Sequence, residues 1–90
     1  MQNSNKTQLA RLRWHCRRGM LELDAMLLPF FDQRYHQITE QQQQAFSELL
    51  NQEDNVLFAW LMGHEQPEEA QQLLEIVTLV REYAKTRDRH

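Results

Sequence analysis

The fold of this chain depends on the stretch Arg17-Arg18-Gly19-Met20-Leu21-Glu22, which separates two amphipathic segments. A glycine can take a positive φ at the end of a helix, and arginines just before it suit the negative pole of the helix dipole. Residues 1–21 carry five Lys or Arg and no acid, and Glu22 is the first carboxylate. The stretch therefore predicts a corner between two helices, at which the charge changes sign.

Helical periodicity continues on both sides of this corner. A first helix is predicted from residue 6 or 7 to Arg17, and a second helix follows the corner. The apolar positions are Leu9, Leu12 and Cys16 in the first, and Met20, Leu23, Met26, Leu27, Phe30 and Phe31 in the second. Pro29 would remove a backbone hydrogen bond, so the sequence leaves open whether the second helix kinks there or ends near residue 28.

Three further helices are predicted in the second half. Thr39, with Gln42 three residues later, forms a capping-box pattern at the start of the third helix. Asp54 is predicted to be the N-cap of a short fourth helix that ends at Gly63, and Pro67 is predicted to begin the fifth. The apolar positions are Ala45, Phe46, Leu49 and Leu50, then Leu57, Trp60 and Leu61, then Leu73, Ile76, Val77, Val80 and Ala84.

These patterns predict an all-α fold, a compact five-helix bundle in which residues 1–90 form a single domain. The short tails, residues 1–6 and 86–90, are expected to fray. Phe30, Phe46 and Trp60 are the expected anchors of a core that must be small in a 90-residue chain.

Composition favours a cytoplasmic protein that binds another protein. The single cysteine, Cys16, excludes an internal disulfide and suits a reducing compartment. No apolar run approaches the ~18 residues of a membrane span, and the first residues lack the apolar core of a secretion signal. Residues 22–80 carry eleven acids against one Arg, which would repel nucleic acid. We therefore predict a monomer with a protein partner, no nucleic acid and no membrane insertion.

The sequence contains no recognisable catalytic or metal-binding cluster. Its four histidines lie on different predicted elements or loops, and Cys16 falls on the apolar face of the first helix with no second thiol near it. No glycine-rich loop of the phosphate-binding kind is present. We therefore predict no enzyme activity, no metal, and no cofactor that the chain holds permanently.

The corner is the predicted functional site. Trp14 falls at the edge of the apolar stripe, so its indole is expected to be partly exposed beside Arg17 and Arg18. Tryptophan and arginine are enriched at interface hot spots. The missing Cβ of Gly19 would let the backbone of a partner approach closely. Helix capping alone is a competing explanation for the same residues.

Residues 14–24, read as Trp-His-Cys-Arg-Arg-Gly-Met-Leu-Glu-Leu-Asp, resemble the signature of the small bacterial FAD assembly factors of succinate dehydrogenase. The related mitochondrial protein is called succinate dehydrogenase assembly factor 2. The resemblance continues through residues 29–31, residues 58–62 and the last helix, and covers roughly residues 8–85. It implies a five-helix assembly chaperone that binds the flavoprotein subunit of succinate dehydrogenase, and often of fumarate reductase. Flavinylation, the covalent attachment of FAD to a histidine of that subunit, is the step it promotes.

The resemblance also implies roles for single residues. Arg18, Gly19 and Glu22 match the motif, with Trp14 and Asp24 as supporting positions. Arg18 is expected to contact a partner carboxylate or a polar group near the flavin. Glu22 is expected either to pair with a partner cation or to hold Arg18. FAD would belong to the partner, and the sequence leaves open a transient contact and the binding of free FAD.

Two alternatives compete with this reading. A small nucleic-acid-binding or antitoxin-like regulator would use the basic first helix, and its binding would weaken steeply with salt. A generic adaptor would dock a partner helix on residues 26–31, although packing in the core explains that segment more simply.

Overall fold

The computed structural model describes residues 2–68 and 70–87, with side chains for residues 6–68 and 70–86. The described residues form five α-helices, one short 3-10 helix and no strand. Their bounds are α1 Gln2–His15, α2 Leu21–Arg34, η1 Tyr35–Gln37, α3 Glu40–Leu50, α4 Asp54–Leu61 and α5 Gln71–Arg87. The prediction of an all-α five-helix bundle is confirmed.

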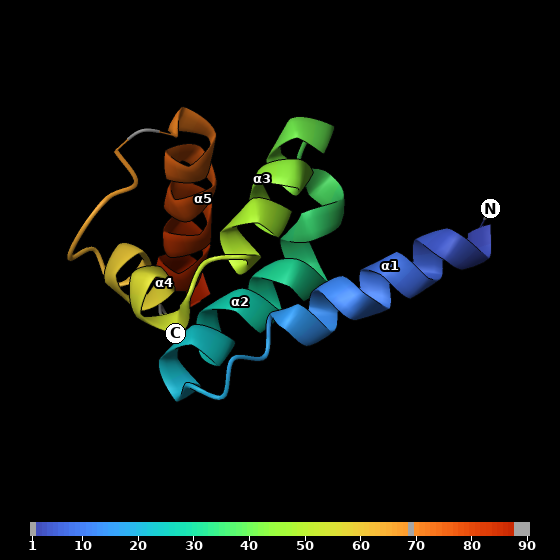
Figure 1. The fold of residues 1–90 in the computed structure, drawn as a ribbon, viewed down its shortest axis with the longest axis horizontal. Helices are drawn as coiled ribbons and strands as arrows, with labels where there is room; N and C mark the ends of the chain where they lie inside the picture. The colour runs from blue at the N-terminus through green and yellow to red at the C-terminus, as the bar shows by residue number, and fades with distance from the viewer. Residues whose placement is uncertain (1, 69, 88–90) are drawn as a thin grey trace.

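The helix α5 is the centre of the packing, because α2, α3 and α4 all contact it. Figure 1 shows α3 and α5 standing side by side, with α2 crossing below them and α1 projecting away from the bundle toward the N-terminus. The radius of gyration is 12.7 Å. A compact chain of this length would have a radius of gyration of about 12 Å, so the projecting α1 increases the radius only slightly.

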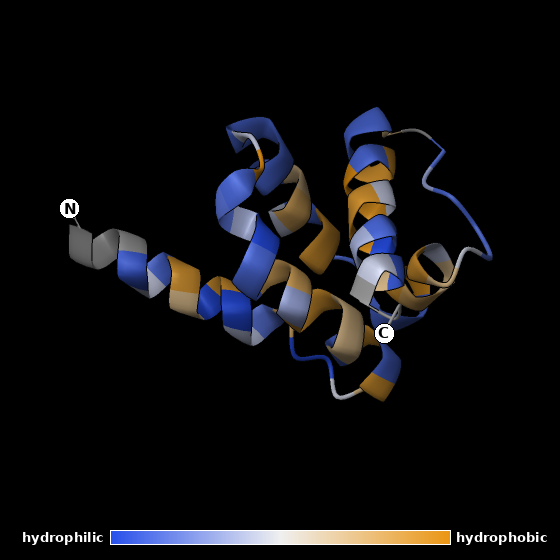
Figure 2. Ribbon diagram, turned by 180° about the vertical axis from the view of Figure 1, so that it is seen from behind, coloured by the Kyte–Doolittle hydropathy of each residue, from blue (hydrophilic) through white to orange (hydrophobic). Residues whose placement is uncertain are grey.

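The core lies where α2, α3, α4 and α5 face one another, and there the ribbon is mainly apolar (Figure 2). Its largest fully buried side chains are those of Phe30 and Phe46, whose ring centroids lie 5.5 Å apart. Cys16 is also fully buried, whereas Leu9 and Leu12 are half-buried against the core. The predicted apolar faces of α3 and α5 are confirmed, with Ala84 only half-buried at the end of α5.

Two predicted helix boundaries are confirmed in detail. The hydroxyl of Thr39 accepts a hydrogen bond from the Gln42 backbone at 3.1 Å, and the Gln42 side chain accepts one from the Thr39 backbone at 2.9 Å. This is the complete capping box. Gly63 follows α4 with a φ of 81°, a value that glycine adopts without strain.

The first two helices differ from their predicted bounds. The helix α1 begins earlier, at Gln2, and ends at His15 rather than Arg17. Its last turn tightens, because Cys16 and Arg17 donate to the carbonyls of Arg13 and Trp14. The helix α2 continues through Pro29 to Arg34, so of the two possibilities that the sequence left open, an end near residue 28 is excluded. Burial of Phe30 and Phe31 beyond the proline outweighs the one hydrogen bond that the proline removes.

Two predicted helix starts are wrong. Glu53, not Asp54, is the N-cap of α4, and Asp54 is its first helical residue. The carboxylate of Asp54 pairs with Arg18 and is therefore directed away from a capping position. The helix α5 begins at Gln71 rather than at Pro67, which is buried within the α4–α5 loop. Glu69, which would fall in the first turn of a helix beginning at Pro67, lies outside the described residues.

The prediction that Trp60 is a main core anchor is also wrong. Trp60 is only partly buried and packs against the outside of the core, whereas Leu57 and Leu61 of the same helix are buried. Phe30 and Phe46 are confirmed as anchors. The single-domain assignment and the frayed tails remain predictions. No helix of the described residues combines the length and the apolar character needed to cross a membrane.

Candidate functional site

The linker between α1 and α2, residues 16–20, is held by the side chain of Arg18. The guanidinium donates four hydrogen bonds: to Oδ1 of Asp54 at 2.8 Å, and to the carbonyls of His15 at 2.9 Å, Leu50 at 2.8 Å and Gln52 at 2.7 Å. Only 14% of the Arg18 side chain is exposed. We call this set of contacts the Arg18 clasp. It ties the linker to the turn between α3 and α4.

A second contact fixes the backbone of the same residue. The Arg18 N–H donates to Oδ1 of Asp24 at 2.7 Å, from one turn into α2. Gly19 follows with a φ of 82°, and a Cβ built on it would meet nothing within 4 Å. Positive φ, not crowding inside the protein, is therefore why glycine is needed here. The predicted positive φ of Gly19 is confirmed.

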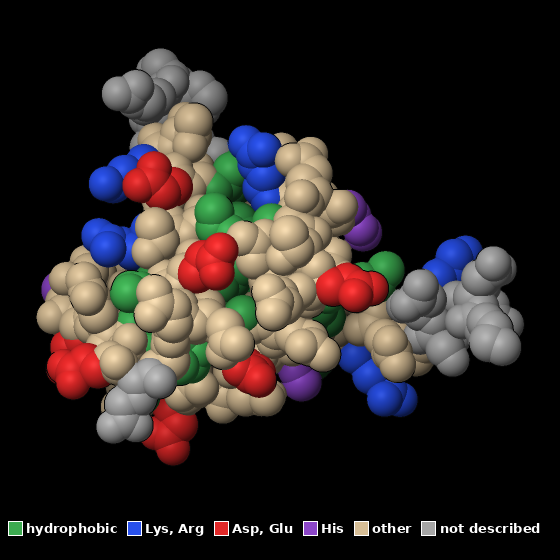
Figure 3. All heavy atoms as spheres, turned by 90° about the horizontal axis from the view of Figure 1, so that it is seen from above, with side chains coloured by type: hydrophobic (Ala, Val, Ile, Leu, Met, Phe, Trp, Pro, Cys, Tyr) green, Lys and Arg blue, Asp and Glu red, His purple; other side chains and the backbone are tan. Residues whose placement is uncertain are grey.

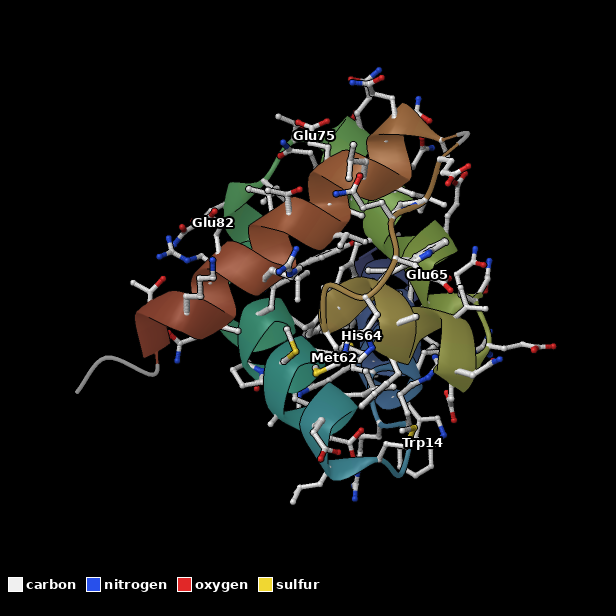
Figure 4. All side chains as sticks on the ribbon, turned by 90° about the vertical axis from the view of Figure 1, so that its left-hand side faces the viewer. Trp14, Met62, His64, Glu65, Glu75 and Glu82 are labelled. Atoms are coloured by element: carbon white, nitrogen blue, oxygen red, sulfur yellow. The ribbon has the colours of Figure 1, made fainter. Side chains whose placement is uncertain are left out.

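Trp14 and Arg17 lie on the exposed side of the linker. The Trp14 side chain is 68% exposed, and the Arg17 guanidinium carbon lies 5.7 Å from the centre of its ring, within cation–π range. Figure 4 shows Trp14 at the edge of the molecule, beside the linker. The expectation of a partly exposed indole beside arginine is confirmed.

Glu22 and Leu21 extend this surface into the first turn of α2. Glu22 is exposed and makes no hydrogen bond or ion pair with another described residue. Of its two predicted roles, holding Arg18 is therefore not observed, because Asp54 and Asp24 do that. Leu21 is 82% exposed, so it adds apolar area to the exposed first turn of α2. We call the exposed residues Trp14, Arg17, Gly19, Leu21 and Glu22 the docking corner.

The structure thus divides the predicted site residues into two groups. Trp14, Arg17, Gly19 and Glu22 are exposed, whereas Arg18 and Asp24 lie beneath them and shape the linker. Asp54 and Leu21 were not predicted as site residues. Leu21 falls off the apolar stripe of α2, which was an available signal. Asp54 is 36 residues from Arg18 along the chain, and no local pattern connects the two.

Fewer basic side chains of the first helix and the linker are free to bind nucleic acid than the charge of this region suggests. Arg13 forms a two-point ion pair with Asp32 of α2, and Arg18 is enclosed in its clasp. On the face seen from above, acidic side chains lie apart from one another and near several Lys and Arg side chains (Figure 3). This arrangement offers little continuous positive surface for a nucleic-acid backbone.

The thiol of Cys16 is unsuited to catalysis. Burial raises its pKa to about 12, so the nucleophilic thiolate is scarcely populated near neutral pH. Among the side chains of residues 6–68 and 70–86, no three His, Cys, Asp or Glu converge as metal ligands. The docking corner thus offers contact surface and fixed backbone geometry.

Two grooves of the described surface contain none of the docking-corner residues. One of about 560 Å³ runs between α1 and α3 beside Leu12 and Tyr35. Another, of about 740 Å³, lies beside Trp60 and Pro67 near His64 and Glu65, which Figure 4 shows beyond the end of α4. The exposed Trp14 beside Arg17 gives the corner the composition of a protein-contact surface.

Comparison with known proteins supports the resemblance noted in the sequence. Residues 10–84 match the family model Sdh5, described as flavinator of succinate dehydrogenase. The chain is 51% identical over 81 residues to a protein of Legionella pneumophila (strain Paris) named FAD assembly factor SdhE, covering 90% of this chain and 96% of that protein. A protein of the same name from Aliivibrio fischeri is 56% identical over 55 residues, covering 61% of this chain and 64% of the relative. These relatives do not support the alternative of a nucleic-acid-binding or antitoxin-like regulator.

Proposed function

This chain belongs to the family of succinate dehydrogenase flavinators, and from that membership we propose that it binds the flavoprotein subunit of succinate dehydrogenase and promotes covalent attachment of FAD to it. The observation that carries the proposal is the docking corner. An exposed tryptophan, a stacked arginine and a positive-φ glycine lie on a linker that Arg18 fixes to the bundle.

Positioning is the proposed mechanism. The acceptor histidine and FAD both belong to the partner, so this chain acts as an assembly factor and supplies no nucleophile or proton-transfer group. The buried, high-pKa thiol of Cys16 supports that assignment. Holding two reacting groups in the right geometry can lower a barrier by several kcal/mol without any new functional group. FAD is a substrate carried by the partner, and any contact that it makes with this chain is transient.

The docking corner supplies the contacts. Trp14 and Leu21 offer apolar area, and Arg17 and Glu22 offer charges of opposite sign within a short distance along the chain. Gly19, without a Cβ, lets the partner backbone approach the linker. Arg18 stays in its clasp and shapes the linker, which replaces the expectation that it binds a partner carboxylate.

We further propose that the chain acts as a monomer in the cytoplasm and also serves the flavoprotein of fumarate reductase. One chain buries its own apolar core, and its one cysteine is unpaired and suits a reducing compartment.

The test uses purified flavoprotein subunit, FAD and this chain, with covalent flavin read by fluorescence in a denaturing gel. Gly19→Ala and Gly19→Arg share the same backbone strain, but only the arginine adds bulk to the surface. We expect Gly19→Ala to retain most of the covalent flavin formed with the natural chain, and Gly19→Arg to lose most of it. Gln72→Arg, an equal addition of charge at an exposed site on α5, is the matched control. Equal flavin with and without the natural chain would refute the function.

A further inference from the structure

The turn between α3 and α4 supplies three of the four acceptors in the Arg18 clasp. They are the carbonyls of Leu50 and Gln52 and the carboxylate of Asp54. These groups lie between the last residue of α3 and the first residue of α4, more than 30 residues from the linker. The conformation of the docking corner is thus anchored in a distant part of the chain.

We infer that Asp54 is a positioning residue for the docking corner. Through Arg18, it holds residues 16–20 in the conformation that the partner recognises. This inference rests on the proposed function, and it assigns Asp54 no contact with the partner or with FAD.

The strength of the Arg18 clasp depends most on Asp54. It is the one ionised acceptor, and charge-assisted hydrogen bonds are roughly twice as strong as neutral ones. The other three acceptors are backbone carbonyls, which accept bonds from any donor and do not select a guanidinium. Asp54 also does not serve α4 as a cap, because Glu53 occupies that position. The side chain is 45% exposed, so solvent screening keeps its effect moderate.

The linker has few other anchors. Cys16 and Arg17 bond back to α1 through their N–H groups, and the Arg18 N–H bonds to Asp24. Gly19 has no side chain and lies in open space. If the guanidinium is released, residues 18–20 keep two hydrogen bonds, both to Asp24: the Arg18 N–H donates to its carboxylate, and the Met20 carbonyl accepts from its N–H. Cys16 stays buried in the core and Met20 packs against it, so residues 17–19 are the part that the guanidinium holds. Weakening the ion pair at Asp54 should therefore loosen Gly19, although Asp54 does not touch it.

A first experiment needs no partner. Amide hydrogen exchange of residues 16–20 is compared in the natural chain, Asp54→Ala and Glu53→Ala. Glu53 is the matched control, because it is the adjacent carboxylate and makes no side-chain cap bond. We expect the exchange of the Arg18 amide, which donates to Asp24, to accelerate about fivefold or more in Asp54→Ala, with no change in Glu53→Ala. Equal exchange in all three proteins would overturn the inference.

A second experiment asks whether Asp54 acts through Arg18. We expect Asp54→Ala to raise the Kd for the flavoprotein about tenfold, while covalent flavin at saturating chain concentration stays the same. Asp54→Asn keeps an acceptor oxygen but loses the charge, so it should restore only part of the affinity. In an Arg18→Gln background, which has no cation to pair with Asp54, Asp54→Ala should change Kd by less than about twofold.

The outcomes separate the inference from the function on which it rests. A tenfold loss in both backgrounds would mean that Asp54 contacts the partner directly, and an unchanged Kd would mean that it has no positioning role; either result contradicts the inference. If the natural chain neither binds the flavoprotein nor raises covalent flavin, the proposed function fails. In that case the exchange experiment still decides whether Asp54 orders the linker.

Discussion

Arg13 and Asp32 form a two-point ion pair that joins α1 to α2. Nε of Arg13 lies 2.8 Å from Oδ1 of Asp32, and Nη2 lies 2.9 Å from Oδ2. The parallel geometry matches the planar guanidinium to the carboxylate. Arg13 lies near the end of α1 and Arg18 in the middle of the linker, so the two arginines tie this part of the chain to different elements, α2 and the α3–α4 turn.

The ion pair predicts a pH-dependent contribution to stability. The hydrogen bond from Arg13, followed by its charge, lowers the pKa of Asp32 below its usual range. A lowered pKa in the folded state stabilises the protein above the unfolded value, about 4, and this stability is lost as the pH falls toward the folded value. We expect Asp32→Asn to unfold at slightly lower urea concentration at pH 7 and to match the natural chain at pH 2.5.

The effect should be small, because both side chains are about half exposed and salt screens them. Glu82→Gln is the control, since it makes the same change of charge at an exposed position on α5 (Figure 4). A difference for Asp32→Asn that persists at pH 2.5 would show that the carboxylate charge is not its source.

Substituting Gly19 should lower the stability of the fold through backbone strain and not through a steric clash. Placing a Cβ at a φ of 82° costs about 1–2 kcal/mol, although the Cβ would contact nothing within 4 Å. We expect Gly19→Ala to lower the free energy of unfolding by about 1 kcal/mol in urea titrations. Gly19→Asn should lose less, because asparagine tolerates positive φ better. An alanine variant as stable as the natural chain would show that the linker takes another conformation in solution.

The burial of two aromatic side chains predicts which of two alanine substitutions costs more stability. Phe46 is fully buried, so Phe46→Ala should cost about 3–5 kcal/mol. Trp60 is larger but only partly buried, and Trp60→Ala should cost about 1–3 kcal/mol. Urea midpoints of the two variants check the order. The reverse order would place the indole inside the core and the phenyl ring outside it.

The burial of Cys16 predicts that its thiol is alkylated slowly in the folded chain. Its side chain is fully buried, and burial raises its pKa to about 12. At pH 8 the folded chain should react with iodoacetamide at least about a hundredfold more slowly than the chain in 6–8 M urea, because both the thiolate and access to it are suppressed. Labelling at similar rates with and without urea would mean that α1 separates from the bundle under native conditions.

The parts of the fold that depend on neighbouring residues could be predicted from the sequence. The Thr39 capping box, the positive φ of Gly63 and the apolar faces of α3 and α5 each follow from residues within one or two turns. The errors concern residues whose positions are decided by distant partners. Asp54 resembles an N-cap locally, but Arg18 takes its carboxylate, and Pro67 resembles a helix start but is buried in a loop.

In the candidate site, too, features set by neighbouring residues could be predicted and those set by distant partners could not. The exposure of Trp14 could be predicted from the apolar stripe of the first helix, and the positive φ of Gly19 from its place at the helix end. The enclosure of Arg18 could not, since three of its acceptors belong to the α3–α4 turn. A charged residue in a motif suggests an outward contact, and only the tertiary structure shows that this one is directed inward.

The Arg18 clasp also affects which substitutions the chain can accumulate. A main-chain carbonyl is present whatever side chain its residue carries, so His15 and Gln52 can be exchanged freely without removing an acceptor for the guanidinium. Position 54 has no such freedom, because its side chain is the acceptor. Among related sequences we expect positions 15 and 52 to drift while 18 and 54 change together or not at all.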